Sequence, residues 1–109
     1  MKLVDIRPQL DPDGITGQVI HVDSYENAIT NISRDVFERT VGGRSFDILV
    51  QSNHYVIRKL NNRYNETEEG ELLALFNSAG LLEIAIRNGN ASGLLRLRTG
   101  SNIRIKFKA

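Results

Sequence analysis

The chain has 109 residues, 40% of them hydrophobic and 25% charged, which is typical of one globular domain. Its formal net charge of +1 is too small for the basic surface of a nucleic-acid-binding protein, and the absence of cysteine excludes disulfides and thiolate chemistry. No apolar run approaches the roughly 18 residues of a membrane span, and the first residues lack the apolar segment of a signal peptide. We therefore expect a soluble, cytoplasmic protein that does not bind a membrane.

The first third of the chain predicts a linker and then a hairpin. Residues 1–15 include the cluster Asp-Pro-Asp-Gly at 11–14, in which proline fixes φ and glycine permits a positive φ. We therefore expect a lead-in or an interdomain linker there. Residues 16–23 and 27–33 predict two short strands, because apolar residues recur on both sides of a polar turn.

A short helix and a series of strands follow. Ser33 is a suitable N-cap for a helical turn over residues 33–39, and residues 90–95 predict a second helical turn. The polar segment 60–70 predicts a loop that is long for a compact domain, and such loops are often functional. The apolar run at 72–76 predicts a strand covered on both faces. Further strands are predicted over residues 46–50, 54–58, 82–86 and 103–107.

These elements predict an all-β domain over residues 16–109. About seven short strands, separated by turn residues such as Asn88-Gly89, are typical of a small antiparallel barrel or sandwich. One or two short helical turns complete this fold.

The polar turn between the first two strands contains an aromatic residue, Tyr25, and an amide, Asn27. An aromatic ring offers a stacking face, and an amide both donates and accepts hydrogen bonds, so the pair suits a flat heterocycle. A plain hairpin with an exposed tyrosine is the alternative that the pattern leaves open.

The same stretch resembles the G-x-V-x-x-x-D-x-F-G-N-x-x-T-N-I signature of the S-adenosylmethionine hydrolases, or hydroxide adenosyltransferases. That family is related to the fluorinase and the chlorinase, and the signature opens its C-terminal domain. The matching residues are Gly17, Val19, Asp23, Tyr25, Asn27, Thr30, Asn31 and Ile32. Two positions depart from the signature, because Tyr25 replaces phenylalanine and Glu26 replaces glycine. A turn that needs a positive φ is strained by glutamate.

Two further blocks extend the resemblance to roughly residues 15–107. Residues 77–85 resemble the family segment N-S-x-G-x-L-x-I-A, and Tyr64 before Gly70 resembles an aromatic that precedes a glycine and a strand. Three ordered blocks are more specific than any one of them. The halogenating members have arginine at the positions of Ala79 and Ile86, so the resemblance favours the branch that uses hydroxide.

The resemblance implies a set of substrate-binding residues. Tyr25 and Asn27 match an aromatic and an amide that contact adenine, and Tyr64 matches a second aromatic of that pocket. Ser78 matches a serine that binds the amino-acid end of the ligand. Asn88 lies where the family offers backbone groups to adenine. The residues alone leave plainer interpretations open, namely a tyrosine packed on the barrel rim and an ordinary turn serine.

The resemblance also implies an activity and partners. The complete enzyme would convert S-adenosylmethionine and water to adenosine and methionine, with S-adenosylmethionine as substrate and no separate cofactor. The residues that activate water belong to an N-terminal domain that nothing in this sequence resembles. The ligand lies between that domain and the C-terminal domain of a neighbouring subunit in a homotrimer. We therefore expect half of a binding site, with no catalytic residue among these 109.

Other polar residues are interpreted as structural. Asp23, Thr30 and Asn31 border a tight turn, where short polar side chains commonly bond the backbone. With two histidines and no cysteine, we expect no metal site.

Two other functions stay open. One is a standalone barrel that binds a nucleotide or single-stranded nucleic acid by stacking, although the near-zero net charge makes nucleic acid an unfavourable partner. The other is a trimerisation domain that has lost its ligand contacts.

Overall fold

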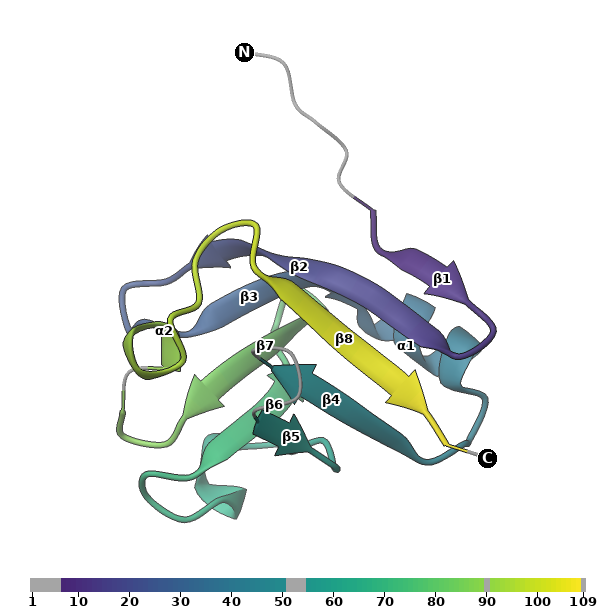
Figure 1. Ribbon diagram of the computed structural model, residues 1–109. Helices are drawn as coiled ribbons and strands as arrows, with labels where there is room; N and C mark the ends of the chain where they lie inside the picture. The colour runs from purple at the N-terminus through teal and green to yellow at the C-terminus, as the bar shows by residue number, and fades with distance from the viewer. Residues whose placement is uncertain (1–6, 51–54, 90, 109) are drawn as a thin grey trace.

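The protein folds into one antiparallel sheet that curls into a nearly closed barrel (Figure 1). The computed structural model describes residues 7–50, 55–89 and 91–108. The strands are β1 (Gln9–Asp11), β2 (Gly14–Val22), β3 (Ala28–Ser33), β4 (Phe46–Val50), β5 (Tyr55–Ile57), β6 (Leu72–Phe76), β7 (Leu81–Ile86) and β8 (Asn102–Phe107). The helices are α1 (Arg34–Val41), the 3-10 helix η1 (Tyr64–Glu66) and α2 (Ala91–Leu94), and none of these described helices could cross a membrane.

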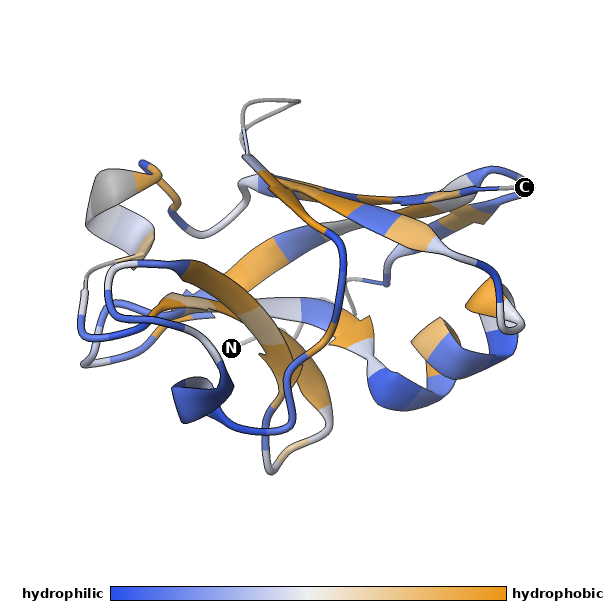
Figure 2. Cartoon of the chain, turned by 90° about the horizontal axis from the view of Figure 1, so that it is seen from below, coloured by the Kyte–Doolittle hydropathy of each residue, from blue (hydrophilic) through white to orange (hydrophobic). Residues whose placement is uncertain are grey.

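The strand order is β5-β4-β8-β2-β3-β7-β6, and β1 pairs with β2 outside this path. The terminal strands β5 and β6 contact each other, so the seven-stranded path nearly closes on itself. This arrangement confirms the predicted all-β barrel. Most of the apolar residues lie on the strands and most of the polar residues in the loops (Figure 2).

The barrel interior is filled by side chains from every second position of the strands. Because strand side chains alternate between faces, the apolar positions of β8 all point inward and its charged positions outward. Fully buried members of this core include Ile15, Val19, Ile32, Ile48, Ile84, Ile103 and Ile105. Each such side chain stabilises the fold by about 1.5–3 kcal/mol relative to an exposed one.

Helix α1 closes one end of the barrel. Ser33 caps it, because its hydroxyl accepts a hydrogen bond of 3.1 Å from the Val36 amide. Gly42 ends the helix in the left-handed conformation, with φ of 56°. The buried Phe37 ring packs edge-on against Phe46, with 5.0 Å between the ring centroids. The cap and the helical turn agree with the sequence prediction.

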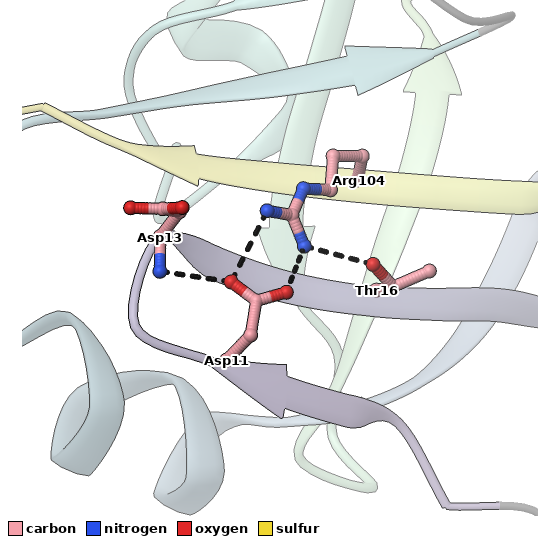
Figure 3. A network of polar contacts seen from close by, with 4 residues as sticks. All are labelled: Asp11, Asp13, Thr16 and Arg104. Carbon is pink, nitrogen blue, oxygen red and sulfur yellow. Dashed lines mark hydrogen bonds and ion pairs between the residues drawn. The ribbon is translucent and has the colours of Figure 1, made fainter.

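The chain enters the barrel through a hairpin that the sequence does not predict. Residues 9–11 pair with β2, and β2 begins at Gly14, within the predicted linker. The Asp11 carboxylate accepts hydrogen bonds from Arg104 of β8, at 2.9 Å to Nη1, and from the Asp13 amide (Figure 3). The three β1 residues are exposed, so they form a strand through backbone pairing, without an apolar pattern.

The outer face of β6 and β7 is also buried, as predicted for residues 72–76. Leu73, Leu75 and Ala85 form a second apolar cluster there. The segment between β5 and β6 crosses near this face, because the Asn61 amide donates 2.8 Å to the Ala74 carbonyl. The predicted ranges of β4 and β6 agree with the structure, while β5 is described only from Tyr55 and the predicted start at His54 lies outside the described residues.

Candidate functional site

An open pocket of about 800 Å³ lies where three separate segments meet. The turn between β2 and β3 contributes Tyr25 and Asn27, helix η1 contributes Tyr64, and the end of β7 contributes Arg87 and Asn88. This volume is in the range of small-molecule sites, and the mixture of aromatic and amide groups fits a heterocyclic ligand. The structure thus brings together four of the five residues that the sequence predicts for a ligand site.

Asp23 shapes the turn that carries Tyr25 and Asn27. One of its carboxylate oxygens accepts hydrogen bonds of 2.9 Å from the amides of both residues, and its own amide donates 3.1 Å to the Asn27 carbonyl. These bonds confirm the structural role expected of Asp23. In this turn Tyr25 is 77% exposed and Asn27 only 8% exposed, so an exposed aromatic residue lies beside a nearly buried amide.

Glu26 keeps the backbone conformation that favours glycine. Its φ is 64°, in the left-handed region, so the turn is retained although the glycine of the family signature is absent. The Ser92 hydroxyl donates to the Glu26 carboxylate, and the Ser92 amide donates 2.8 Å to the Glu26 carbonyl. These two bonds fasten the turn to helix α2.

The long loop before β6 brings Tyr64 to the pocket. Arg87 anchors this loop, because its guanidinium donates 2.8 Å to the Thr67 carbonyl and its own carbonyl accepts 2.9 Å from the Gly70 amide. The Asn88 side chain donates 3.0 Å to Glu69. The Asn88 side chain therefore binds the loop.

The Tyr64 hydroxyl points to a buried carboxylate. It donates a hydrogen bond to Glu83 of β7, whose side chain is 4% exposed. Tyr64 is only partly buried, and this partial burial, followed by the bond to Glu83, raises its pKa well above the ordinary range, while the Asn27 amide acts in the opposite direction. Tyr64 therefore stays neutral and keeps its proton donation to Glu83 at physiological pH.

Ser78 lies apart from this pocket. It belongs to the turn between β6 and β7, at the other end of β7 from Asn88, and it is not among the residues that line the pocket. Sequence reasoning overlooks Arg87 and Glu83, because their contacts join segments that are distant along the chain. Within the described residues, no cluster of three His, Asp or Glu side chains could hold a metal ion.

Known proteins resemble this chain in sequence and in fold. An (R)-S-adenosyl-L-methionine hydrolase from Thermus thermophilus is 33% identical over 93 residues, which cover 85% of this chain and 32% of the hydrolase. An uncharacterized conserved protein from Thermotoga maritima matches with a TM-score of 0.78 and 28% identity, covering 96% of this chain and 41% of its own. A conserved hypothetical protein, also from Thermus thermophilus, gives a TM-score of 0.70 and 26% identity, covering 94% of this chain and 38% of its own.

This chain therefore spans about a third of the length of the curated hydrolase, 32%. The family described as the SAM hydroxide adenosyltransferase C-terminal domain matches residues 17–104. That range contains the whole pocket and the Ser78 turn. The chain accordingly belongs to the family of SAM hydroxide adenosyltransferase C-terminal domains.

Proposed function

We propose that the pocket binds the adenine ring of S-adenosylmethionine, and that the chain is the adenosyl-contacting domain of an adenosine-forming S-adenosylmethionine hydrolase. The observation that carries the proposal is the convergence of Tyr25, Asn27, Tyr64 and Asn88 from three segments on one pocket. The name of the T. thermophilus relative, a hydrolase of S-adenosylmethionine, supports the choice of ligand.

Each group has a distinct part in this binding. The exposed Tyr25 ring stacks on the purine, which contributes about 0.5–1.5 kcal/mol beyond area burial. The Asn27 amide pairs with the polar edge of the base. Its backbone is fixed by a hydrogen bond to Asp23, so less backbone entropy is lost when the ligand binds. A base with the wrong edge leaves the amide unpaired and is rejected.

In the complete protein, this domain forms one wall of the active site. Water attacks the ribose C5′ carbon, the new O–C5′ bond replaces the C5′–S bond, and methionine leaves as the thioether while the water gives up a proton. A second domain, on a neighbouring subunit of a homotrimer, activates the water. Ile86 lines the pocket at a position where the halogenating members have arginine, which favours water over halide as the nucleophile.

A titration of this chain followed by NMR tests the ligand. We expect adenosine to bind with a Kd near the millimolar range, about −4 kcal/mol, because half of the site is present. Amide shifts should cluster at Tyr25, Asn27 and Asn88, and inosine, which alters the polar edge, should bind more weakly. Equal shifts with both nucleosides, or shifts spread over the surface, would contradict adenine recognition. Strong, salt-dependent binding of an oligonucleotide would favour the stacking module instead.

The role of Asn27 is tested in the complete enzyme. Asn27→Ala should raise KM for S-adenosylmethionine at least tenfold, since a lost edge contact of about 1.4 kcal/mol has that effect. Asn102→Ala, at an exposed asparagine of β8 outside the pocket lining, is the matched control and should leave KM within about twofold. Unchanged kinetics of the Asn27 variant would remove this residue from the site.

A further inference from the structure

A buried glutamate lies between the pocket and the Ser78 turn. Glu83 is 4% exposed on the outer face of β7, where Leu75 of β6 and Ile29 of β3 are its partners in register. Carboxylates are almost never fully buried unless they are paired. None of the ion pairs among the described residues includes Glu83.

Hydrogen bonds take the place of a counter-charge. One carboxylate oxygen of Glu83 accepts a hydrogen bond from the Tyr64 hydroxyl, and the other accepts one of 3.4 Å from the Asn77 side chain. These two partners come from opposite directions along β7. The carboxylate is therefore held by two donors, each of which belongs to a different part of the proposed ligand site.

The bonds continue beyond the two partners. The Asn77 oxygen accepts 2.9 Å from the Ala79 amide and 3.1 Å from the Leu81 amide, so Asn77 fixes the turn that contains Ser78. On the other side, the Tyr64 ring lines the pocket beside Asn27. One connected row of polar contacts thus runs from the Ser78 turn through Asn77 and Glu83 to Tyr64.

We propose that Glu83 is a positioning residue that orients Tyr64 toward the pocket and fixes the distance between this pocket and the Ser78 turn. The inference rests on the proposed function, in which Tyr64 contacts the adenosyl group and Ser78 the amino-acid end. Glu83 acts through these residues and does not touch the ligand. A buried carboxylate is a poor choice for stability alone, because an apolar side chain of similar size packs well in such a place.

The contrast between stability and binding tests this role. Glu83→Met removes a buried carboxylate beside Leu75 and Ala85 but leaves the donors of Tyr64 and Asn77 without their acceptor. These effects oppose each other, so the unfolding midpoint should change only slightly. The same variant should weaken adenosine binding about tenfold, because Tyr64 loses its charged acceptor. Glu83→Gln keeps an acceptor for the Tyr64 hydroxyl, so its adenosine affinity should lie between those of the wild type and Glu83→Met. Glu68→Met, on an exposed glutamate, is the matched control.

The Tyr64→Phe variant tests the same hydrogen bond from its other partner. It removes the hydroxyl and keeps the ring, so it should weaken adenosine binding to a similar degree, and the double variant should lose no more than either single one. Unchanged adenosine affinity in Glu83→Met and in Tyr64→Phe would overturn the positioning role.

A ligand-free measurement separates this inference from the proposed function. In the unliganded chain, ring resonances of Tyr64 and amide resonances of Ser78 and Ala79 should both shift in Glu83→Met, and those of Tyr25 should not. If the wild-type chain does not bind adenosine while these shifts occur, the adenine proposal fails and the positioning role stands. If neither set of resonances moves, the positioning role fails whatever the ligand result.

Discussion

Glu26 adopts a backbone conformation that an L-residue normally avoids. Its φ of 64° costs about 1–2 kcal/mol, and the hydrogen bond from the Ser92 hydroxyl offsets this cost. Glu26→Ala keeps the strain and loses the bond, so we expect the free energy of unfolding to fall by about 1–2 kcal/mol. Glu26→Gly loses the same bond but relieves the strain, and should be close to wild type. Urea denaturation measures both changes.

Ser92→Ala is the control for the Glu26 contact. It should destabilise the wild-type protein and have little further effect in Glu26→Ala, because the shared bond is already absent. If Glu26→Ala is as stable as Glu26→Gly, the turn does not hold residue 26 in the left-handed region. Glutamate at this position is therefore more strained than glycine, but its carboxylate forms a hydrogen bond with α2 that glycine cannot form.

The Thr30 side chain of β3 forms hydrogen bonds at an irregular point in the pairing of β3 with β7. The pairing of β3 with β7 shifts register between Ile29 and Ser33, which interrupts the regular ladder. The fully buried Thr30 hydroxyl donates 2.9 Å to the Leu82 carbonyl and accepts 3.2 Å from the Ile32 amide. A side chain thus bonds backbone groups at the point where the regular ladder is interrupted.

Thr30→Val should therefore cost about 1–3 kcal/mol of unfolding free energy, although valine has the same shape, because two buried backbone groups lose their partner. Thr30→Ser retains the hydroxyl and should cost only about 0.8 kcal/mol for the missing methyl group. Chemical denaturation of the two variants compares the effects, and hydrogen exchange at the Ile32 amide should accelerate in the valine variant alone. A serine variant that is less stable than the valine one would contradict this role.

The elements differ in how far the sequence predicts them. The apolar runs of β4 and β6 are bounded by polar turn residues, so local pattern is enough for their ranges. β1 carries no such pattern, since its three exposed residues depend on pairing with β2. The loop over 60–70 is predicted as a loop, but its placement depends on bonds from Asn61 to Ala74 and from Arg87 to Thr67, which no local signal contains.

The candidate site divides in the same way. The turn of Tyr25 and Asn27 is visible in the sequence, because Asp and Asn beside an aromatic mark a polar turn. That Tyr64 faces the same space is implied by the family resemblance and not by any local pattern. Glu83 has the pattern of the polar position of a half-buried strand, and only the approach of the loop explains its burial. The ligand roles of all these residues stay predictions.

At the scale of the whole molecule, the barrel joins segments from both ends of the chain. Asp11 and Arg104 are 93 positions apart, and their side chains meet over the pairing of β2 with β8 (Figure 3). Thr16 accepts a further bond of 2.8 Å from Arg104. These bonds fasten the β1–β2 hairpin to β8, so they hold the first strands of the chain against the last one.

The link predicts a pH dependence of stability. The Arg104 guanidinium, followed by the Asp13 amide, holds the pKa of Asp11 below its ordinary value near 3.8. The charged form is thus favoured in the folded state, so the stabilisation is present above about pH 4 and is lost as the pH falls through the folded pKa. Asp11→Asn should lower the melting temperature at neutral pH, and its difference from wild type should shrink in acid. Asp13→Asn makes the same charge change while its backbone amide still donates to Asp11, so it should show a smaller effect at neutral pH. A deficit of Asp11→Asn that persists unchanged in acid would show that the amide substitution disturbs the turn itself, and that the ion pair contributes nothing.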